Sequence, residues 1–281
     1  MNYINYKTFT AKQDKGILVV TFDNPPVNIQ DIEMLNDLDR LCETLEQDKT
    51  VKVVIFESAN PDIFIAHADI TFLKDMSTTP VAKDEVQLSK LQLVLERVST
   101  LPQATIAKIE GFARGGGHEF CLACDMRFAA KGKAVFMQME VGMGILPCGG
   151  GSSRMARQVG LGRALQIILS AKDFTAEEAE RLGTINEAVD ADKIGAYVYD
   201  LAERISKFPS ESITACKRTV YASVDLPIKK ALYEEAYELY QATSQTPAIK
   251  RFKQAYDTYF QNSLENQKNF ENLLMGLQEI K

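Results

Sequence analysis

Apolar residues recur along the chain with two different spacings. Two short runs rich in β-branched residues, at 16–23 and 52–57, are predicted strands, and the second is continuously apolar, as buried parallel strands are. Between them, apolar residues recur every three or four positions, which predicts an amphipathic helix over about 30–47. The same spacings predict further strands at 105–110, 126–130, 134–138 and 185–189, and further helices at about 82–100, 152–160 and 162–170.

From about Asp192 onward the apolar pattern is helical only. Leu232, Ala236, Leu239 and Ala242 share one helix face, and a second apolar stripe runs through Leu273, Leu274, Leu277 and Ile280. Strands that alternate with helices, followed by helices alone, predict an α/β core over residues 1–207 and a helical region over 208–281. The apolar stripes must be buried, either on the chain's own core or on a neighbouring subunit.

Composition narrows the class of protein. The 281 residues are 46% hydrophobic and 25% charged, as in an ordinary globular protein, and the net charge of −6 argues against a general nucleic-acid or membrane-surface role. No apolar run approaches the ~20 residues of a membrane span, and the first residues lack the apolar segment of a signal peptide. Five cysteines without framework spacing predict reduced thiols and a cytoplasmic location.

Two local motifs carry structural interpretations. Cys121 and Cys124 form a CxxC pair, but the chain has two histidines and no second cysteine pair at zinc spacing, so buried helix packing is the better interpretation and no metal is expected. Thr175, with Glu178 three residues later, is typical of a capping box at the start of a helix.

The stretch Gly111–Phe120, which reads Gly-Phe-Ala-Arg-Gly-Gly-Gly-His-Glu-Phe, is the strongest candidate for chemistry. It lies between a predicted strand and an apolar segment that reads as buried helix, so its glycines occupy a strand-to-helix turn. The first N–H groups of a helix have no partner within the helix and carry the positive end of its dipole, and glycines let a ligand approach them. Glu119 follows Gly116 by about one helical turn, so its carboxylate reaches the same spot. The stretch therefore predicts an anion site with a carboxylate beside it.

Three segments, 64–70, 111–119 and 136–151, resemble in their order and spacing the motifs of the crotonase superfamily, the enoyl-CoA hydratase/isomerase family. The resemblance covers about 15–265 and includes the turn Asn24-Pro-Pro-Val-Asn28. It implies an α/β fold, a crotonase-like spiral of ββα turns with a C-terminal helical trimerisation region. It also implies an acyl-CoA thioester as substrate, a trimer or a dimer of trimers as the assembly, and no separate cofactor, because coenzyme A is part of the substrate.

By this resemblance, backbone N–H groups of Ala68 and Gly116 form an oxyanion hole for the thioester oxygen. Preorganised donors stabilise the enolate charge that builds there, and losing one costs about 2.7–4 kcal/mol in comparable sites. Glu119 and Glu140 match the two carboxylates that hold a water molecule in the family's hydratases, one acting as a base and the other as an acid.

The resemblance thus implies hydration of a 2-enoyl-CoA to a 3-hydroxyacyl-CoA. Residue alternation puts Phe136, Gln138 and Glu140 on one side of an extended segment. Two alternatives stay open. One is a double-bond isomerase that uses one glutamate as a shuttling base on the same fold. The other is a non-catalytic acyl-CoA-binding protein.

Binding of coenzyme A is implied for two segments that would offer their backbone to it. The candidate residues are Pro26, Val27, Ile65, Ala66 and Asp69. The glycines of 142–151 are expected to form the acyl pocket and a tight start of the next helix, because they lack the spacing of a nucleotide-binding loop.

Several positions depart from the family pattern or lie beside it. His67 stands where glycine is usual, Met139 where proline is common, and Thr71 where lysine often helps to bind coenzyme A. Because the donor is the backbone N–H of Ala68, a histidine at position 67 is compatible with the oxyanion hole. His67 itself is expected to be partly buried with a local hydrogen bond. Alternatively, it shapes the nucleotide pocket or narrows access to it. Two neighbours of the glycines are expected to have no catalytic role. Arg114 is expected to be a structural ion-pair partner, and His118 is expected to face another way on the helix than Glu119.

Overall fold

The computed structural model describes residues 2–74, 79–257 and 263–277 and contains two β-sheets. The larger sheet is ordered β1 (Phe9–Asp14), β2 (Ile17–Phe22), β3 (Val53–Ser58), β5 (Ala104–Ile109), β7 (Met126–Ala130) and β10 (Glu187–Val189). The smaller sheet is ordered β4 (Ile63–Ile65), β6 (Phe112–Arg114), β8 (Val135–Met137) and β9 (Phe174–Thr175). All neighbouring strands are parallel except β1 with β2 and β8 with β9.

From β3 to β8, consecutive strands alternate between the two sheets. The chain passes from β3 to β4, from β5 to β6 and from β7 to β8, and a helix follows each pair. This alternation is the predicted spiral of ββα turns, and the fold class is confirmed. The helices that follow or flank the strands are α1 (Ile32–Gln47), α2 (Lys90–Thr100), α3 (Gly116–Ala123), α4 (Gly151–Val159), α5 (Leu161–Ser170), α6 (Ala176–Leu182) and α7 (Ile194–Ser206).

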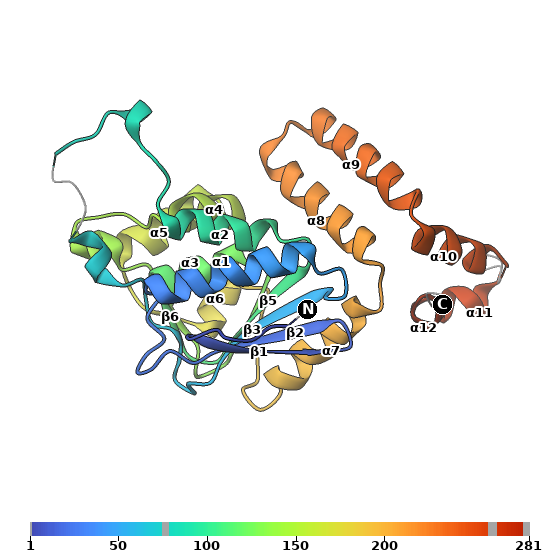
Figure 1. The fold of residues 1–281 in the computed structure, drawn as a ribbon, viewed down its shortest axis with the longest axis horizontal. Helices are drawn as coiled ribbons and strands as arrows, with labels where there is room; N and C mark the ends of the chain where they lie inside the picture. The colour runs from blue at the N-terminus through green and yellow to red at the C-terminus, as the bar shows by residue number, and fades with distance from the viewer. Residues whose placement is uncertain (1, 75–78, 258–262, 278–281) are drawn as a thin grey trace.

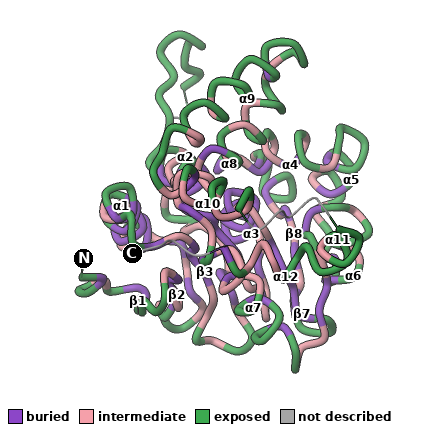
Figure 2. Tube along the Cα trace, turned by 90° about the vertical axis from the view of Figure 1, so that its right-hand side faces the viewer, coloured by how far each residue is buried: buried purple, intermediate pink, exposed green. Residues whose placement is uncertain are grey.

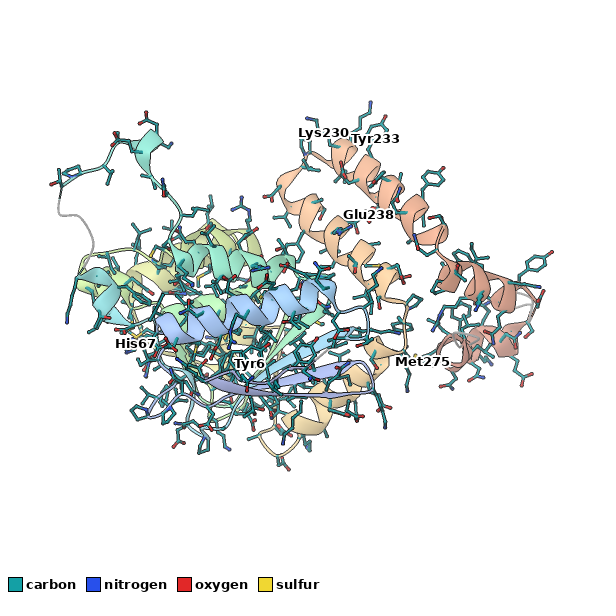
Figure 3. The ribbon with its side chains drawn as sticks, in the orientation of Figure 1. Tyr6, His67, Lys230, Tyr233, Glu238 and Met275 are labelled. Atoms are coloured by element: carbon teal, nitrogen blue, oxygen red, sulfur yellow. The ribbon has the colours of Figure 1, made fainter. Side chains whose placement is uncertain are left out.

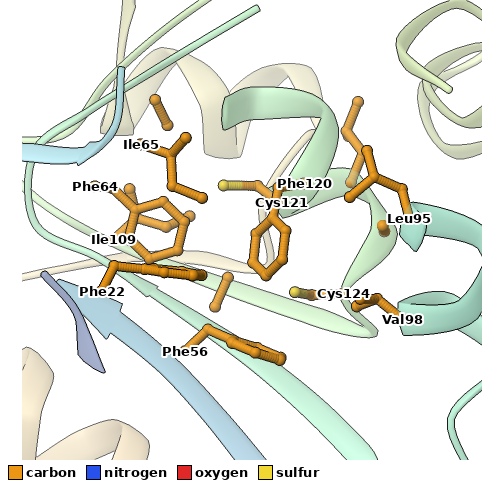
Figure 4. Close-up of a cluster of buried hydrophobic side chains, with 14 of the residues drawn as sticks. Phe22, Phe56, Phe64, Ile65, Leu95, Val98, Ile109, Phe120, Cys121 and Cys124 are labelled. Carbon is orange, nitrogen blue, oxygen red and sulfur yellow. The ribbon is translucent and has the colours of Figure 1, made fainter. Parts of the chain in front are cut away.

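The larger sheet is covered on both faces. Helices α1 to α6 contribute apolar side chains to the core on one face, while Ile194, Val198 and Ala202 of α7 pack on the other (Figure 1). Helix α3 lies within the first layer, where the ring of Phe120 is 5.3 Å from Phe22 and 5.0 Å from Phe56 between ring centroids (Figure 4). The glycine-rich turn is therefore anchored by a fully buried helix.

Several local predictions are confirmed. Thr175 accepts a hydrogen bond from the N–H of Glu178, and the Glu178 carboxylate accepts one from the N–H of Thr175, so the capping box opens α6. Cys121 and Cys124 are free thiols, both fully buried in the core (Figure 4). Strands β2, β3, β5, β7, β8 and β10 lie within two residues of their predicted limits.

Other local predictions need correction. The helix expected over 82–100 is a short 3-10 turn at Lys83–Glu85 followed by α2, because Ser89 and Gln92 form a capping box that starts the helix at Lys90. Strands β1, β4, β6 and β9 were not predicted. β1 is an edge strand with mostly exposed polar residues, and the other three have two or three residues each, which is too short for a periodic signal.

The C-terminal helices extend away from the sheets (Figure 1). They are α8 (Ser210–Asp225), α9 (Ile228–Thr243), α10 (Thr246–Asp257), α11 (Leu264–Lys268) and α12 (Phe270–Gly276). Helix α8 is tied to the core by the ion pair of Lys217 with Asp125 at 2.9 Å, and to α9 by that of Arg218 with Glu238 at 3.6 Å. The predicted limit at 207/208 falls in the turn between α7 and α8.

The apolar face of α9 is exposed on this chain. Leu232 and Leu239 are 53% and 59% exposed, and Tyr233 and Tyr240 are also exposed. Much of α9 is coloured as exposed in Figure 2, and Tyr233 lies on this helix in Figure 3. The chain's own core therefore does not cover the face that the sequence pattern defined. Of the second stripe, Leu277 is buried, while Ile280 lies outside the described residues. Within the described ranges, no helix combines the length and apolar content needed to cross a bilayer.

Candidate active site

Three strands of the smaller sheet end at one place. β4, β6 and β8 are parallel neighbours, so their carboxyl ends meet at the same edge of the sheet. β4 leads into His67 and Ala68, β6 into Gly115 and Gly116, and β8 into Glu140. Residues that are far apart in the sequence are thereby gathered at one site.

The backbones of Ala68 and Gly116 approach closely there. A methyl group added to Gly116 would lie 2.8 Å from the nitrogen of Ala68. Gln30 forms a parallel bridge with Ala68, donating its N–H to the carbonyl of His67 and accepting from the N–H of Asp69, both at 3.0 Å. This pattern turns the N–H of Ala68 away from Gln30, and Gly116 is the first residue of α3. Neither N–H donates to any acceptor in the described part of the chain, so both are available to a ligand.

Glycine is required at two positions of the turn. Gly115 has a φ of +47°, and a methyl group on it would lie 2.9 Å from Oε1 of Glu140. A methyl group on Gly117 would lie 2.1 Å from the carbonyl oxygen of Ile65. The Glu140 carboxylate therefore lies against Gly115, and the start of α3 packs closely against the end of β4 at Gly117.

Glu119 projects from the first turn of α3 into a buried position. Its Oε1 accepts a hydrogen bond of 2.8 Å from the N–H of Gly151, at the start of α4. Burial, together with the charge of Glu140, raises the pKa of Glu119 to about 7, against the opposing effect of the hydrogen bonds from Gly151 and Gly149. A carboxyl group with such a pKa exchanges its proton near neutral pH.

Glu140 is also buried, and its Oε2 has no hydrogen-bond partner among the described residues. Burial raises the pKa of Glu140, while the N–H groups of Glu140 and Met139 and the nearby His67 lower it. The predicted alternation holds, because Phe136, Gln138 and Glu140 are all buried. The strand itself ends at Met137, however, and Glu140 begins a 3-10 turn that directs its carboxylate back over Gly115.

The neighbouring side chains take the expected places. Nδ1 of His67 lies 2.9 Å from the carbonyl oxygen of Ala68, a local hydrogen bond on a half-buried residue at the core end of the molecule (Figure 3). His118 is fully buried with Nδ1 3.2 Å from Nε2 of Gln138, and burial lowers the pKa of His118 to about 3, so the ring is neutral. Arg114 forms a two-pronged ion pair with Asp173 at 2.8 and 2.7 Å, which confirms it as an ion-pair partner.

The two segments expected to bind coenzyme A lie side by side. The carbonyl of Val27 accepts a hydrogen bond from the N–H of Ala66 at 3.3 Å, and that of Pro26 accepts one from Asn60 at 3.2 Å. Ala66 and Asp69 are half-buried, whereas the side chain of Ile65 is fully buried in the core. Any contact by Ile65 would therefore be through its backbone, and the binding roles of these residues stay predictions.

Two features near the glutamates carried no sequence signal. Cys148 is an exposed residue that directly precedes Gly149, on which a methyl group would lie 2.5 Å from Oε2 of Glu119. Partial burial of the thiol and the charges of Glu119 and Glu140 raise the pKa of Cys148. Gln30 is fully buried beside Ala68 and Gly116, in a position that the sequence pattern marked only as the approximate start of a helix. Among the described residues, no group of three or more His, Cys, Asp or Glu side chains could hold a metal ion.

Comparison with known proteins agrees with this geometry. The model of the enoyl-CoA hydratase/isomerase family matches residues 12–271. The short-chain-enoyl-CoA hydratase of Clostridium acetobutylicum is 32% identical over 226 residues, covering 80% of this chain and 85% of that protein. The crotonyl-CoA hydratase of Syntrophomonas wolfei is 29% identical over 233 residues, covering 82% of this chain and 88% of that one.

Solved structures show the same fold. The structure of an enoyl-CoA hydratase homologue from Streptomyces avermitilis is 32% identical with a TM-score of 0.73, and the match covers 99% of this chain and 100% of that one. The enoyl-CoA hydratase structure from Bacillus anthracis is 23% identical with a TM-score of 0.80, covering 90% of this chain and 97% of that one. The family match spans both sheets, the glycine turn and most of the C-terminal helices, and the chain belongs to the enoyl-CoA hydratase/isomerase family of the crotonase superfamily.

Proposed function

We propose that the protein hydrates a 2-enoyl-CoA thioester to a 3-hydroxyacyl-CoA. The observation that carries this proposal is the placement of two buried carboxylates, Glu119 and Glu140, around the glycine turn. At this turn the backbones of Gly116 and Ala68, each with a free N–H group in the described structure, approach closely. An anion site and a carboxylate pair are the two parts that addition of water to a conjugated thioester needs.

The reaction divides into three events at this site. The thioester oxygen accepts hydrogen bonds from Ala68 and Gly116, which draws electron density from the double bond. One glutamate takes a proton from water as the water oxygen bonds to the β-carbon, and the electron pair of the double bond moves toward the α-carbon and the thioester oxygen. The other glutamate, in its acid form, delivers a proton to the α-carbon, and a proton returned from the first glutamate to the second restores the starting state.

The raised pKa of both carboxyl groups supports the assignment of one glutamate as the base and the other as the acid. A pKa of about 7 at Glu119 allows the acid and base forms to be present together near neutral pH. The mutual effect of the two charges favours the state in which one carboxyl is protonated and the other ionised. Coenzyme A would be held as part of the substrate by the segments at 26–28 and 65–69, and the proposal requires no separate cofactor.

An isomerase is the second candidate function. A single buried glutamate with a pKa near 7 is suited to carry a proton between two carbons of an enoyl thioester, and Glu119 meets that description. The carboxylate of Glu140, which lies against the glycine turn at Gly115, favours hydration, because isomerisation needs no group to hold water.

Assembly through the C-terminal helices is part of the proposal. The exposed apolar face of α9, with Leu232, Tyr233, Leu239 and Tyr240, supports a trimer or a dimer of trimers in which a neighbouring subunit covers this face. We also propose a cytoplasmic location, on the ground that the five cysteines are free thiols.

Incubation with crotonyl-CoA tests the function. Hydration predicts loss of the conjugated-enoyl absorbance together with a product heavier by one water molecule, which mass spectrometry identifies. Consumption of a 3-enoyl-CoA alone, without a change of mass, would favour the isomerase. Tight binding of thioesters without turnover at any chain length would support a non-catalytic binding protein.

A further inference from the structure

Gln30 places an unpaired amide group inside the protein. The residue follows the turn at 24–28 and precedes α1, and its side chain has no exposed surface. Within the described part of the chain, neither its Oε1 nor its Nε2 has a hydrogen-bond partner. A buried amide without a partner is unfavourable, and an apolar side chain of the same size would avoid that cost.

The amide lies against Gly116 and Ala68, the two residues whose N–H groups form the candidate oxyanion hole. Residues of a parallel bridge direct their side chains to the same side of the ladder, and Gln30 is bridged to Ala68. A methyl group added to Gly116 would lie 2.6 Å from Oε1 of Gln30, 2.7 Å from Cβ of Ala68 and 2.8 Å from the Ala68 nitrogen. The Gln30 amide and the Ala68 backbone thus border the same side of Gly116.

No hydrogen bond among the described residues fixes the orientation of this amide. A half-turn that exchanges Oε1 and Nε2 therefore breaks no hydrogen bond, and it presents an N–H group where Oε1 lies. An anion between Ala68 and Gly116 would favour that orientation, because the N–H then points toward negative charge.

We propose that Gln30 is a catalytic residue, a third hydrogen-bond donor that contacts the thioester oxygen together with the backbone N–H groups of Ala68 and Gly116. This role rests on the proposed function, because negative charge on that oxygen is what the donor stabilises. The amide is unpaired and fully buried in the free protein, so the groups around it must shift to admit the thioester oxygen, and the amide then gains its partner. The cost of burying it is thereby recovered in the complex, and most fully as enolate charge develops.

Replacement of Gln30 by leucine removes the donor and keeps much of the shape. With crotonyl-CoA we expect the Gln30→Leu variant to lose about 10- to 100-fold in kcat, at or below the range typical of one lost oxyanion donor, with a smaller change in KM. Its melting temperature should rise, because two unpaired polar atoms leave the core.

A matched control is the same substitution at Gln103. This glutamine is also buried, but its Nε2 donates to the carbonyls of Leu45 at 2.7 Å and Asp48 at 3.1 Å. Gln103→Leu should lower the melting temperature and leave kcat unchanged. Opposite effects of one substitution at two buried glutamines separate a functional amide from a structural one.

The carbonyl stretch of bound butyryl-CoA, labelled with 13C at the thioester carbon, tests the contact without turnover. In the unchanged protein, binding should shift this infrared band to lower frequency, and Gln30→Leu should reduce that shift. An equal shift in both proteins overturns the proposal. If the leucine variant does not fold, the same comparison is made with Gln30→Met. A wild-type protein that binds the thioester without hydrating 2-enoyl-CoA contradicts the proposed function, while the infrared comparison still decides the role of Gln30.

Discussion

The N–H of Gly151 donates a hydrogen bond of 2.8 Å to Oε1 of Glu119. It joins the first residue of α4 to a carboxylate on the first turn of α3, so two helices fix the position of one acid group. A methyl group on Gly149 would lie 2.5 Å from Oε2 of the same carboxylate. Gly149 and Gly151 therefore lie directly against the Glu119 carboxylate, and the tight helix start expected from the sequence is confirmed.

Stability should depend on pH through Glu119. Its pKa is raised from 4.5 to about 7, so between these pH values the folded protein holds a proton that the unfolded chain releases. The free energy of unfolding therefore falls as pH rises through this interval. The change amounts to roughly 3 kcal/mol, at 1.36 kcal/mol for each unit of pKa.

Glu119→Gln isolates this effect. The glutamine keeps an oxygen to accept from Gly151 but has no charge to bury. We expect denaturant unfolding to show the variant more stable than wild type above pH 7 and equally stable below pH 4.5. A constant difference across that range would contradict the raised pKa.

A methyl group at Gly116 should impair activity. Gly116→Ala forces the Ala68 backbone to move, because its nitrogen would be 2.8 Å from the new carbon. We expect kcat to fall by about 100-fold or more, as the paired N–H donors lose their geometry. The measurement is steady-state hydration of crotonyl-CoA.

Gly162→Ala is the matched control. Gly162 lies in α5, and in the described structure no atom beyond its chain neighbours and the adjacent helix backbone lies within 4 Å of the position its methyl group would take. This variant should keep full activity and gain roughly 0.5–1 kcal/mol in stability, because alanine restricts the unfolded chain. Equal activity of the two variants would show that the Ala68 and Gly116 contact does not matter.

Arg114 should contribute little to either stability or substrate binding. Its ion pair with Asp173 is partly exposed, so Arg114→Gln should cost about 1 kcal/mol or less in unfolding free energy. KM for crotonyl-CoA should stay within about twofold of wild type. A large rise in KM for Arg114→Gln, absent from Asp173→Asn, would instead identify Arg114 as a substrate contact.

The α/β fold could be predicted from the sequence because apolar residues recur at a clear spacing in the longer strands and helices. The first four residues of β3 are all apolar, α1 has a full amphipathic repeat, and Thr175 with Glu178 marks a helix start. The glycines 115–117 could be related to an anion site by chemistry alone, since a strand-to-helix turn exposes free N–H groups. The family resemblance then supplied Ala68 and Glu140, which no local pattern connects to that turn.

The remaining features depend on tertiary contacts. The short strands β4 and β6 exist because they pair with each other and with β8, and two or three residues leave no periodic signal. Gln30 belongs to the site through its bridge to Ala68, 38 residues apart by the difference of their numbers. Glu119 is buried where Gly149 and Gly151 lie against its carboxylate, and the sequence around Glu119 does not reveal this burial or the raised pKa that follows from it.

The exposed face of α9 should control assembly. Leu239→Lys puts a charge where a neighbouring subunit would bury an apolar side chain, and we expect light scattering to show a lower mass. Gln241→Lys adds the same charge at an exposed polar position of the same helix and should leave the mass unchanged. A wild-type protein that is monomeric at every concentration would contradict the proposed assembly.

Hydration of crotonyl-CoA by wild type, Glu119→Gln and Glu140→Gln tests the central claim most directly. Each substitution removes a proton-transfer group, so kcat should fall by about 10²- to 10⁴-fold in either variant. The kcat of the double variant should be about as low as that of the less active single variant, because the two carboxyl groups act as a unit. Loss of activity in both single variants, with correct folding and thioester binding, is the result predicted by the two-carboxylate account. Unchanged activity in both variants would contradict it.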